Sequence, residues 1–233
     1  YRLCSERVSE ASLAGLDLSR WRVAYSGSEP IRQDSLASFA DTFKACGFDP
    51  QSFFASYGLA EATLFVSGSR RGQGIPALAL DADALAANRA EPGTGSVLMS
   101  CGFPQPGHAV RIVEPQQLQR LGDNQVGEIW AGGPSIASGY WRNPEASARA
   151  FVEMDGQTWL RTGDLGFMRE GEVFVTGRLK DMLIVRGQNL YPQDLEKTLE
   201  REVQALRKGR VAVFAVEHQG EEGIGVAVEI SRS

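Results

Sequence analysis

Apolar and polar residues follow a clear pattern in the first part of the chain. Residues 21–30 (WRVAYSGSEP) form a short apolar run that ends in Ser-Gly-Ser, which is typical of a buried strand entering a turn. Residues 32–48 have helical spacing of apolar positions and Gly47 as a helix-ending residue. Those positions are Leu36, Phe39, Ala40 and Phe43. A second apolar run, residues 52–65, has a loop in its middle. The order strand, helix, strand predicts an α/β arrangement with parallel pairing.

The middle of the chain follows two other patterns. Residues 67–100 are dominated by Gly, Ala, Asp and Pro and have poor periodicity, so we interpret them as an inserted segment. Short alternating runs then lie between glycine turns, at residues 108–113 (HAVRIV), 126–133 (VGEIWAGG) and 172–177 (EVFVTG). This alternation predicts an antiparallel β subdomain.

The pattern changes again after Lys180. An apolar run at residues 182–185 predicts a strand. Residues 190–208 predict a helix with Pro192 in its first turn. One face of this helix would carry Leu195, Leu199, Val203 and Leu206. The runs RVAVFAVE and GIGVAVEIS then predict paired strands.

These patterns predict two domains with a boundary near residue 178. Residues 1–178 would form a large α/β domain with an antiparallel β subdomain and an insertion at about residues 67–100. Residues 179–233 would form part of a small α+β domain.

Composition excludes several classes of function. The chain has 233 residues and a formal net charge of -5, and it contains no long basic run, so nucleic-acid binding is not expected. No apolar stretch reaches the length of a membrane span. Hydrophobic residues make up 42% of the chain, which suffices for a globular core.

Cysteines and histidines are few. Cys4, Cys46 and Cys101 lie far apart and are odd in number, which indicates free thiols in a reducing, cytoplasmic compartment. The two histidines, His108 and His218, are too few for a zinc site or a Ser-His-Asp triad to be expected.

Asp164 is the first candidate for chemistry. It lies between two glycines in RTGDLG, residues 161–166. Its carboxylate can accept hydrogen bonds from two neighbouring hydroxyls, as on a ribose, and glycine permits close approach. The alternative is an ordinary Asp-Gly turn.

Two further segments place polar groups beside apolar runs. In SYGLAE, residues 56–61, Tyr57 can stack on a base and Glu61 can hold a magnesium ion; the alternative is a buried tyrosine and a helix-start glutamate. In SGSEP, residues 26–30, backbone groups can face an adenine edge, or the segment is a plain strand-to-turn junction.

Arg178 can pair with ribose or phosphate oxygens, because its guanidinium fork suits both; the alternative is a solvated surface arginine. The chain contains no GxxxxGK[ST] loop and no complete GxGxxG after a strand, so neither a P-loop nor a Rossmann site is supported.

The order of these segments is more specific than any one of them. YSGSEP, YGLAEAT, RTGDLG and GRLKDMLIVRGQNLYPQDLE follow one another over nearly the whole chain. This order resembles the adenylate-forming enzymes: acyl-CoA synthetases, luciferases and nonribosomal-peptide adenylation domains. Within that superfamily three features are most similar to fatty acyl-AMP ligases: the motifs YGLAEATL and GQNLYPQDLE, and the segment 67–100. Such ligases are often the loading domains of lipopeptide and siderophore synthetases.

The resemblance implies a reaction and a set of site residues. Such enzymes join a carboxylate to ATP with magnesium, giving acyl-AMP and pyrophosphate, and pass the acyl group to the phosphopantetheine thiol of a carrier protein, fused or separate. By resemblance Asp164 and Arg178 hold the ribose, and Glu61 serves the magnesium and phosphates. The nucleotide-binding residues would be Ser28, Glu29, Ser56, Tyr57, Gly58, Ala60, Glu61, Asp164 and Arg178, with Tyr57 packed on adenine.

The resemblance also gives Lys180 a role. The family rotates its small domain between two half-reactions about the residue two after the motif arginine, which is Lys180 here. Charged residues suit such a pivot, because they avoid burying apolar surface in only one state. The alternative is a plain surface lysine. The segment RGQNLYP would be a turn of the moving domain.

The chain begins at Tyr1 and ends just after a strand-like run, so we expect it to be a piece of a larger protein. The resemblance implies that the phosphate loop, a histidine motif and the catalytic lysine lie outside it, and that this chain alone is impaired in catalysis. Acyl chain length is not predicted, since Phe54, Leu64 and Phe65 suit an acyl tunnel and a core equally.

Two rival functions remain open. A long- or medium-chain fatty acyl-CoA synthetase would share the first half-reaction, but in the similar family the insertion restrains the motion that coenzyme A transfer needs. A noncatalytic adenylate-binding module would keep the fold alone, although the presence of Asp164, Glu61 and Arg178 favours a working site.

Overall fold

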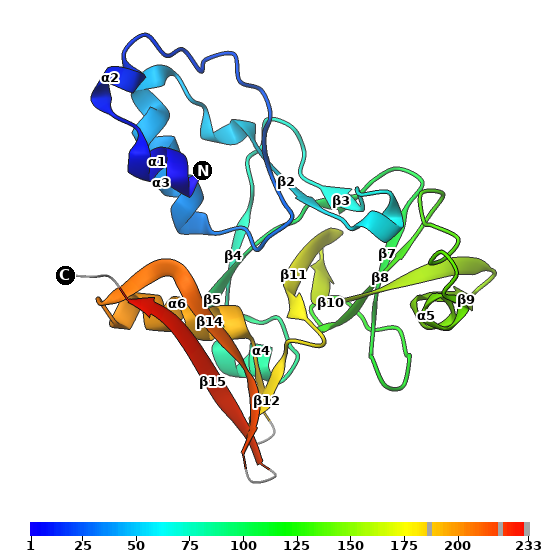
Figure 1. Ribbon diagram of the computed structural model, residues 1–233. Coiled ribbons are helices and arrows are strands. Elements are labelled where there is room, and N and C mark those ends of the chain that lie inside the picture. Colours follow the sequence, from blue (N-terminus) through cyan, green and yellow to red (C-terminus); the bar gives the residue numbers. More distant parts are fainter. Residues whose placement is uncertain (186–187, 219–220, 231–233) are drawn as a thin grey trace.

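The computed structural model describes residues 1–185, 188–218 and 221–230. The first layer contains the predicted strand, helix and strand (Figure 1): β1 (Ala24–Ser26), α3 (Gln33–Phe43) and β2 (Phe53–Tyr57). Strands β1 and β2 pair in parallel, with Ala24 opposite Phe53, which confirms the predicted arrangement. The sheet continues in the order β1-β2-β3-β6 through β3 (Ser67–Gly68) and β6 (Phe103–Pro104).

Helix α3 covers this sheet with its apolar face. Leu36, Phe39 and Phe43 are buried in one cluster with Phe48 and Phe53. The helix continues into the 3-10 turn η1 (Lys44–Cys46), and Gly47 ends it with a φ of 80°. The short helices α1 (Arg2–Arg7) and α2 (Glu10–Leu13) lie beside α3, and η2 (Pro50–Ser52) leads into β2 (Figure 1).

An antiparallel sheet forms the second part of the molecule, as the alternating runs predict. Its strand order is β11-β10-β8-β7, and β9 pairs with β10. The strands are β7 (Ala109–Val113), β8 (Gly127–Gly132), β9 (Phe151–Met154), β10 (Gln157–Arg169) and β11 (Glu172–Arg178), and the helix α5 (Pro144–Ala150) precedes β9. Trp130, Trp159 and Phe167 are at most 1% exposed, so this sheet carries much of the core.

The segment between the two sheets is an ordered hairpin despite its poor periodicity. It consists of β4 (Ala77–Leu80), α4 (Ala82–Ala86) and β5 (Pro92–Met99). Leu80 and Leu85 are buried in a cluster with Phe167, Phe174 and Tyr191. The hairpin therefore shares its core with the antiparallel sheet and with the C-terminal part of the chain.

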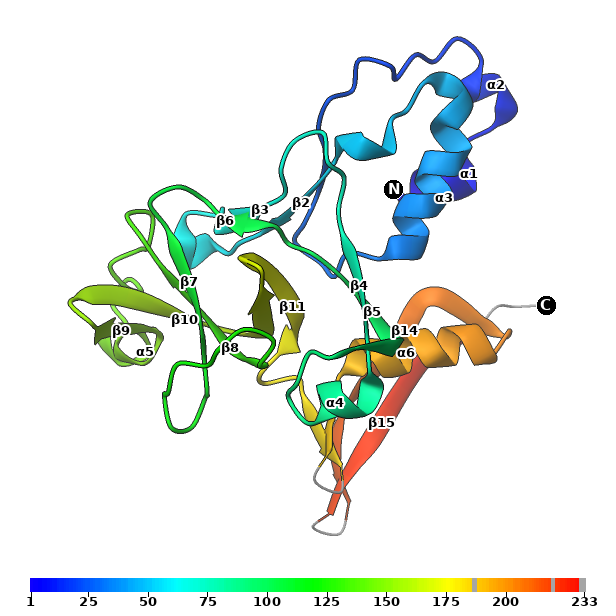
Figure 2. The same cartoon turned by 180° about the vertical axis from the view of Figure 1, so that it is seen from behind.

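The C-terminal part lies next to this hairpin in both views (Figures 1 and 2). It contains β12 (Leu183–Val185), β13 (Gln188–Leu190), α6 (Pro192–Glu202), β14 (Leu206–His218) and β15 (Glu221–Ile230). Strands β14 and β15 pair antiparallel, as predicted. Arg186 and Gly187 of the expected RGQNLYP turn lie outside the described residues.

The predicted helix 190–208 is too long at its C-terminal end. Helix α6 ends at Glu202, and Val203 has extended backbone angles. Leu206 instead begins β14, where it pairs with Ile230. Apolar residues at helical spacing are equally suited to a strand start, and the partner strand decides the outcome here. No helix among the described residues is long and apolar enough to cross a membrane.

Candidate functional site

Asp164 lies on a bulge of β10. The pairing of β10 with β8 shifts register between Arg161 and Leu165. Gly163 has a φ of 71° in this interval, a left-handed backbone that glycine adopts readily. Bulges bend a strand and redirect its side chains. Asp164 is only 7% exposed and lies opposite Arg178 of β11.

Both carboxylate oxygens of Asp164 accept hydrogen bonds. Tyr57 of β2 donates its hydroxyl to Oδ2 at 2.8 Å, and Arg178 donates Nε to Oδ1 at 3.1 Å. Burial raises the pKa of Asp164 above its usual value, while the Tyr57 hydrogen bond and the Arg178 charge oppose that shift. Burial also raises the pKa of Tyr57, with the Asp164 charge adding to it, so the hydroxyl stays a donor. A carboxylate offers about four acceptor positions, so capacity for a ligand remains.

A second buried carboxylate holds the bulge in place. Glu128 of β8 accepts hydrogen bonds at Oε2 from Arg161 Nε at 3.0 Å and Nη2 at 2.9 Å, and from Trp130 Nε1 at 3.0 Å. Its Oε1 accepts the backbone N–H of Gly163 at 3.2 Å. The Glu128 side chain is 3% exposed and engaged at both oxygens, so it fixes the backbone next to Asp164.

Glu61 lies on the single 3-10 turn η3 (Ala60–Ala62) that follows β2. The chain before it is tightly packed, because a Cβ on Gly58 would lie 1.4 Å from the Leu64 carbonyl oxygen. Glu61 is half-buried. Its Oε1 accepts the Tyr140 hydroxyl at 2.7 Å, and its backbone carbonyl accepts the Ala137 N–H at 2.8 Å.

The loop that contains these partners is joined to η3 at further points. Ser135 Oγ donates to the Ala62 carbonyl at 2.8 Å, and Thr63 Oγ1 donates to the Ser135 carbonyl at 2.7 Å. His108 Nε2 lies 2.7 Å from Ser135 Oγ.

The predicted residues on the adenine side lie at the ends of β1 and β2. Ser28 and Glu29 are exposed after β1, and Ser28 has a φ of 69°. Ser56 lies in β2, where a Cβ on Gly27 would come within 2.5 Å of its Oγ. Ala60 is exposed at the start of η3. These roles stay predictions, since the structure shows where the residues lie and not what they bind.

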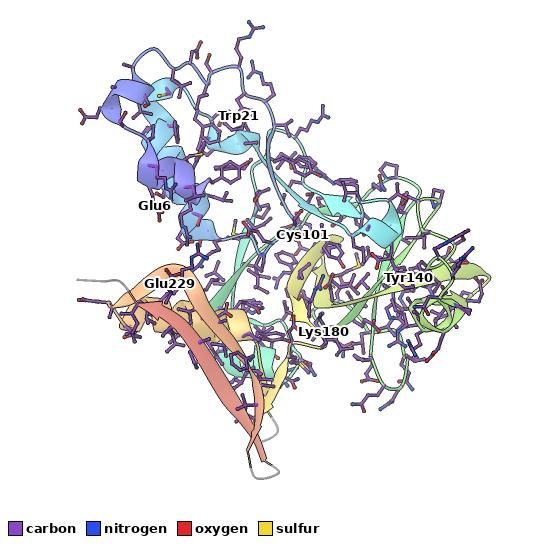
Figure 3. The ribbon with its side chains drawn as sticks, viewed as in Figure 1. Glu6, Trp21, Cys101, Tyr140, Lys180 and Glu229 are labelled. Carbon is purple, nitrogen blue, oxygen red and sulfur yellow. The ribbon has the colours of Figure 1, made fainter. Side chains whose placement is uncertain are left out.

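Lys180 is exposed in the turn that follows β11. The Arg178 carbonyl closes this turn by accepting the N–H groups of Asp181 and Met182, each at 3.1 Å. Figure 3 shows Lys180 where the chain passes from the antiparallel sheet to the C-terminal strands. The hinge role stays a prediction.

Asp164 is therefore in direct contact with both Tyr57 and Arg178, whereas Glu61 has its own hydrogen-bond partners. Sequence reasoning missed Tyr140, Ser135, His108 and Glu128. Tyr140 meets Glu61 across 79 positions of sequence, so no local pattern reveals that pair. The alternation in VGEIWAGG was the one available signal for Glu128, as a charged residue inside a buried run.

A hollow of about 590 Å³ lies behind the loop that contacts η3. Its lining includes Gly133, Ile136, Ser147, Phe151 and Gln157. None of the predicted site residues lines it. The described part of the chain contains no group of three or more His, Cys, Asp or Glu residues that can hold a metal ion by themselves.

Comparisons with known proteins agree with the arrangement of the fold. Residues 2–141 match the family of AMP-binding enzymes. The chain is 43% identical to a medium-chain fatty acid–[acyl-carrier-protein] ligase of Moorena producens, over 100% of the chain and 41% of that relative. The chain thus spans well under half the length of this relative.

Solved structures give the same result. A structure from work on fatty acyl-adenylate ligases of E. coli and L. pneumophila matches with a TM-score of 0.89 at 37% identity, covering 100% of this chain and 42% of that one. The fatty acyl-adenylate ligase of L. pneumophila in complex with acyl adenylate and pyrophosphate matches with a TM-score of 0.75 at 38% identity, with the same coverage.

Proposed function

The chain belongs to the AMP-binding enzyme family, and from that premise we propose that it carries the nucleotide site of a fatty acyl-AMP ligase. In this reaction a fatty acid carboxylate oxygen attacks the α-phosphorus of ATP, the new acyl–phosphate bond forms, and pyrophosphate leaves. The acyl group then passes to the thiol of a carrier protein, and AMP leaves. The contact of Asp164 with Tyr57 and Arg178 is the observation that carries this proposal.

The Asp164 surroundings fit a ribose. The carboxylate is held rigidly on the bulge and keeps acceptor capacity for two neighbouring hydroxyls. Arg178 is 59% exposed at its side chain, so its remaining N–H groups are accessible to the nucleotide. Tyr57 and the segments with Ser28, Glu29, Ser56, Gly58 and Ala60 would form the adenine side.

The Glu61 surroundings fit Mg²⁺ bound together with nucleotide phosphates. Glu61 Oε2 accepts no hydrogen bond from the residues that the structure describes, so it is free to bind a cation. Mg²⁺ commonly uses one or two protein carboxylates plus substrate phosphates. When bound, the ion neutralises phosphate charge, and the protein contribution is to position the carboxylate.

The C-terminal part would move about Lys180, as a small domain of residues 179–233 against a large domain of residues 1–178. In the present arrangement it is joined to the 67–100 segment by polar contacts. Ser96 Oγ donates to Asp194 Oδ2 at 2.9 Å, and Asn189 donates to Asn88 at 3.0 Å. These contacts support a restrained domain motion, and hence a carrier protein rather than coenzyme A as acyl acceptor.

The substrates and partners follow from this proposal. They are a fatty acid, ATP with Mg²⁺, and an acyl or peptidyl carrier protein, fused or separate, in the cytoplasm. The relative of Moorena producens is named as a ligase of this kind.

The test uses the complete protein with ATP, Mg²⁺ and fatty acids of graded length, with and without coenzyme A. Products are identified by mass spectrometry. We expect acyl-AMP that persists when coenzyme A is present, and none in the Asp164→Ala variant. Acyl-CoA would instead assign the protein as a conventional synthetase, and no adenylate with any acid would favour a noncatalytic module.

A further inference from the structure

The loop of residues 133–140 holds Glu61 from two sides. Ala137 binds its backbone carbonyl, and Tyr140 binds its side-chain Oε1 at 2.7 Å. Ser135 also binds the carbonyl of Ala62, the next residue. The turn η3 spans only three residues and has little regular structure to fix it, so these bonds determine where the carboxylate lies.

Tyr140 is itself held in one position. Ser147 Oγ accepts its backbone N–H at 2.8 Å, and its ring packs edge-on against Phe151 with centroids 5.5 Å apart. Gly139 has a φ of 145°, and a Cβ there would lie 2.9 Å from Ser147 Oγ. The chain before Tyr140 therefore requires glycine, and the helix α5 with the start of β9 fixes the direction of the ring.

The bond from Tyr140 to Glu61 contributes little to folding. Tyr140 is 39% exposed, and water can replace an exposed hydrogen bond at small cost. The effect of this hydrogen bond is to orient the Glu61 carboxylate. With Oε1 engaged, Oε2 is the oxygen that remains open.

We infer that Tyr140 is a positioning residue that orients Glu61 so that only Oε2 faces the divalent cation. This inference rests on the proposed function, since it concerns the cation that Glu61 would bind. Hydrogen bonds behind a metal-binding carboxylate fix its geometry. A single carboxylate oxygen also suits an octahedral ion that keeps its waters and nucleotide phosphates.

The experiment measures Mn²⁺ binding to the complete protein by electron paramagnetic resonance, with a nonhydrolysable ATP analogue present. Tyr140→Phe removes the hydroxyl and keeps the ring against Phe151. We expect Mn²⁺ to bind about tenfold more weakly, which is the usual effect of losing such a partner. Binding of the analogue without metal and the thermal midpoint should stay unchanged.

The neighbouring Trp141→Phe serves as the matched control, because Trp141 is 87% exposed and its ring lies against the Arg142 guanidinium. Its Mn²⁺ affinity should equal that of the parent. Glu61→Gln should weaken Mn²⁺ binding, and adding Tyr140→Phe to it should have no further effect, because the hydroxyl acts through the carboxylate.

The outcomes separate two failures. If Glu61→Gln weakens Mn²⁺ binding and Tyr140→Phe does not, the positioning role is wrong and the proposed metal ligand stands. If Tyr140→Phe lowers the Mn²⁺ affinity equally in the parent protein and in Glu61→Gln, the tyrosine does not act through Glu61. If Glu61→Gln has no effect, the proposed metal ligand and the role of Tyr140 are both wrong.

Discussion

The carboxylates of Asp164 and Glu61 lie in contrasting surroundings. Asp164 is 7% exposed, lies on a strand between two partner strands, and has both oxygens engaged by protein donors. Glu61 is half-buried, lies on a three-residue turn, and has one oxygen engaged. The first is fixed by the sheet, whereas the second is fixed by hydrogen bonds from one loop.

This contrast matches what each group would bind. A ribose presents two hydroxyls in fixed geometry, which favours an acceptor built into a rigid element. The set of phosphate and water ligands around a bound cation differs between the substrate and product states. This favours a carboxylate with one oxygen left open to the cation. The burial of Asp164 raises its pKa, which means that burial disfavours the ionised carboxylate.

The largest expected effect separates nucleotide binding from metal binding. Asp164→Ala in the complete protein should weaken metal-free AMP binding by at least about a hundredfold. Two hydrogen bonds to a charged acceptor are lost, each worth roughly 1.5–3 kcal/mol. Glu61→Gln should leave this metal-free affinity within about twofold, because its proposed partner is the cation and not the nucleotide. Calorimetric titration in the presence of a chelator measures both.

The exposed Asp123→Ala is the control for loss of one negative charge, and it should bind AMP as the parent does. Equal AMP affinity in Asp164→Ala and the parent would contradict the prediction, because the buried carboxylate would then not bind the nucleotide.

The second effect concerns the support of the bulge. Glu128→Gln should lower the free energy of unfolding by about 2–3 kcal/mol, because it leaves the Arg161 charge partly buried without its partner. Glu61→Gln should change this free energy by no more than about 0.5 kcal/mol. Urea denaturation midpoints at unchanged slope measure the difference. Equal midpoints in the two variants would show that the Glu128 contacts do not stabilise the bulge.

The sequence predicts the fold where local pattern and partner agree. Apolar spacing in residues 32–48 predicts α3, and Gly47 within that range marks the end of the helical segment. The prediction of a helix over 190–208 is wrong at its C-terminal end. Leu206 suits a strand as well as a helix, and its pairing with Ile230 places it in β14. The hairpin β4–β5 lacks periodicity because its glycines, such as Gly93 beside Asp81, serve close backbone approach rather than burial.

Some residues of the candidate site can also be predicted from the sequence, and others cannot. Resemblance of short motifs picks out Tyr57, Asp164 and Arg178, and in the structure Tyr57 of β2 and Arg178 of β11 both contact Asp164 of β10. Tyr140 carries no charge and lies in a separate segment, so only the folded chain reveals its contact with Glu61. The residues proposed to bind ligand are thus easier to find by pattern than the residue proposed to orient Glu61.

The smallest effect is a pH dependence that belongs to Asp164 alone. Its pKa lies above the ordinary value of 3.8 in the folded protein, chiefly because of burial. Between these two pKa values the folded state binds more protons than the unfolded state, so the contribution of Asp164 to stability falls as the pH rises through this window.

The Asp164→Asn variant tests this, because asparagine does not titrate. The thermal midpoint of this variant minus that of the parent should therefore increase as the pH rises from about 4, and level off once the carboxyl is ionised in both states. Other groups titrate alike in both proteins and cancel in the difference. Scanning calorimetry across this range measures it. A difference that stays constant or shrinks for Asp164→Asn would mean that Tyr57 and Arg178 outweigh burial, and that the two carboxylates differ less than their exposure indicates.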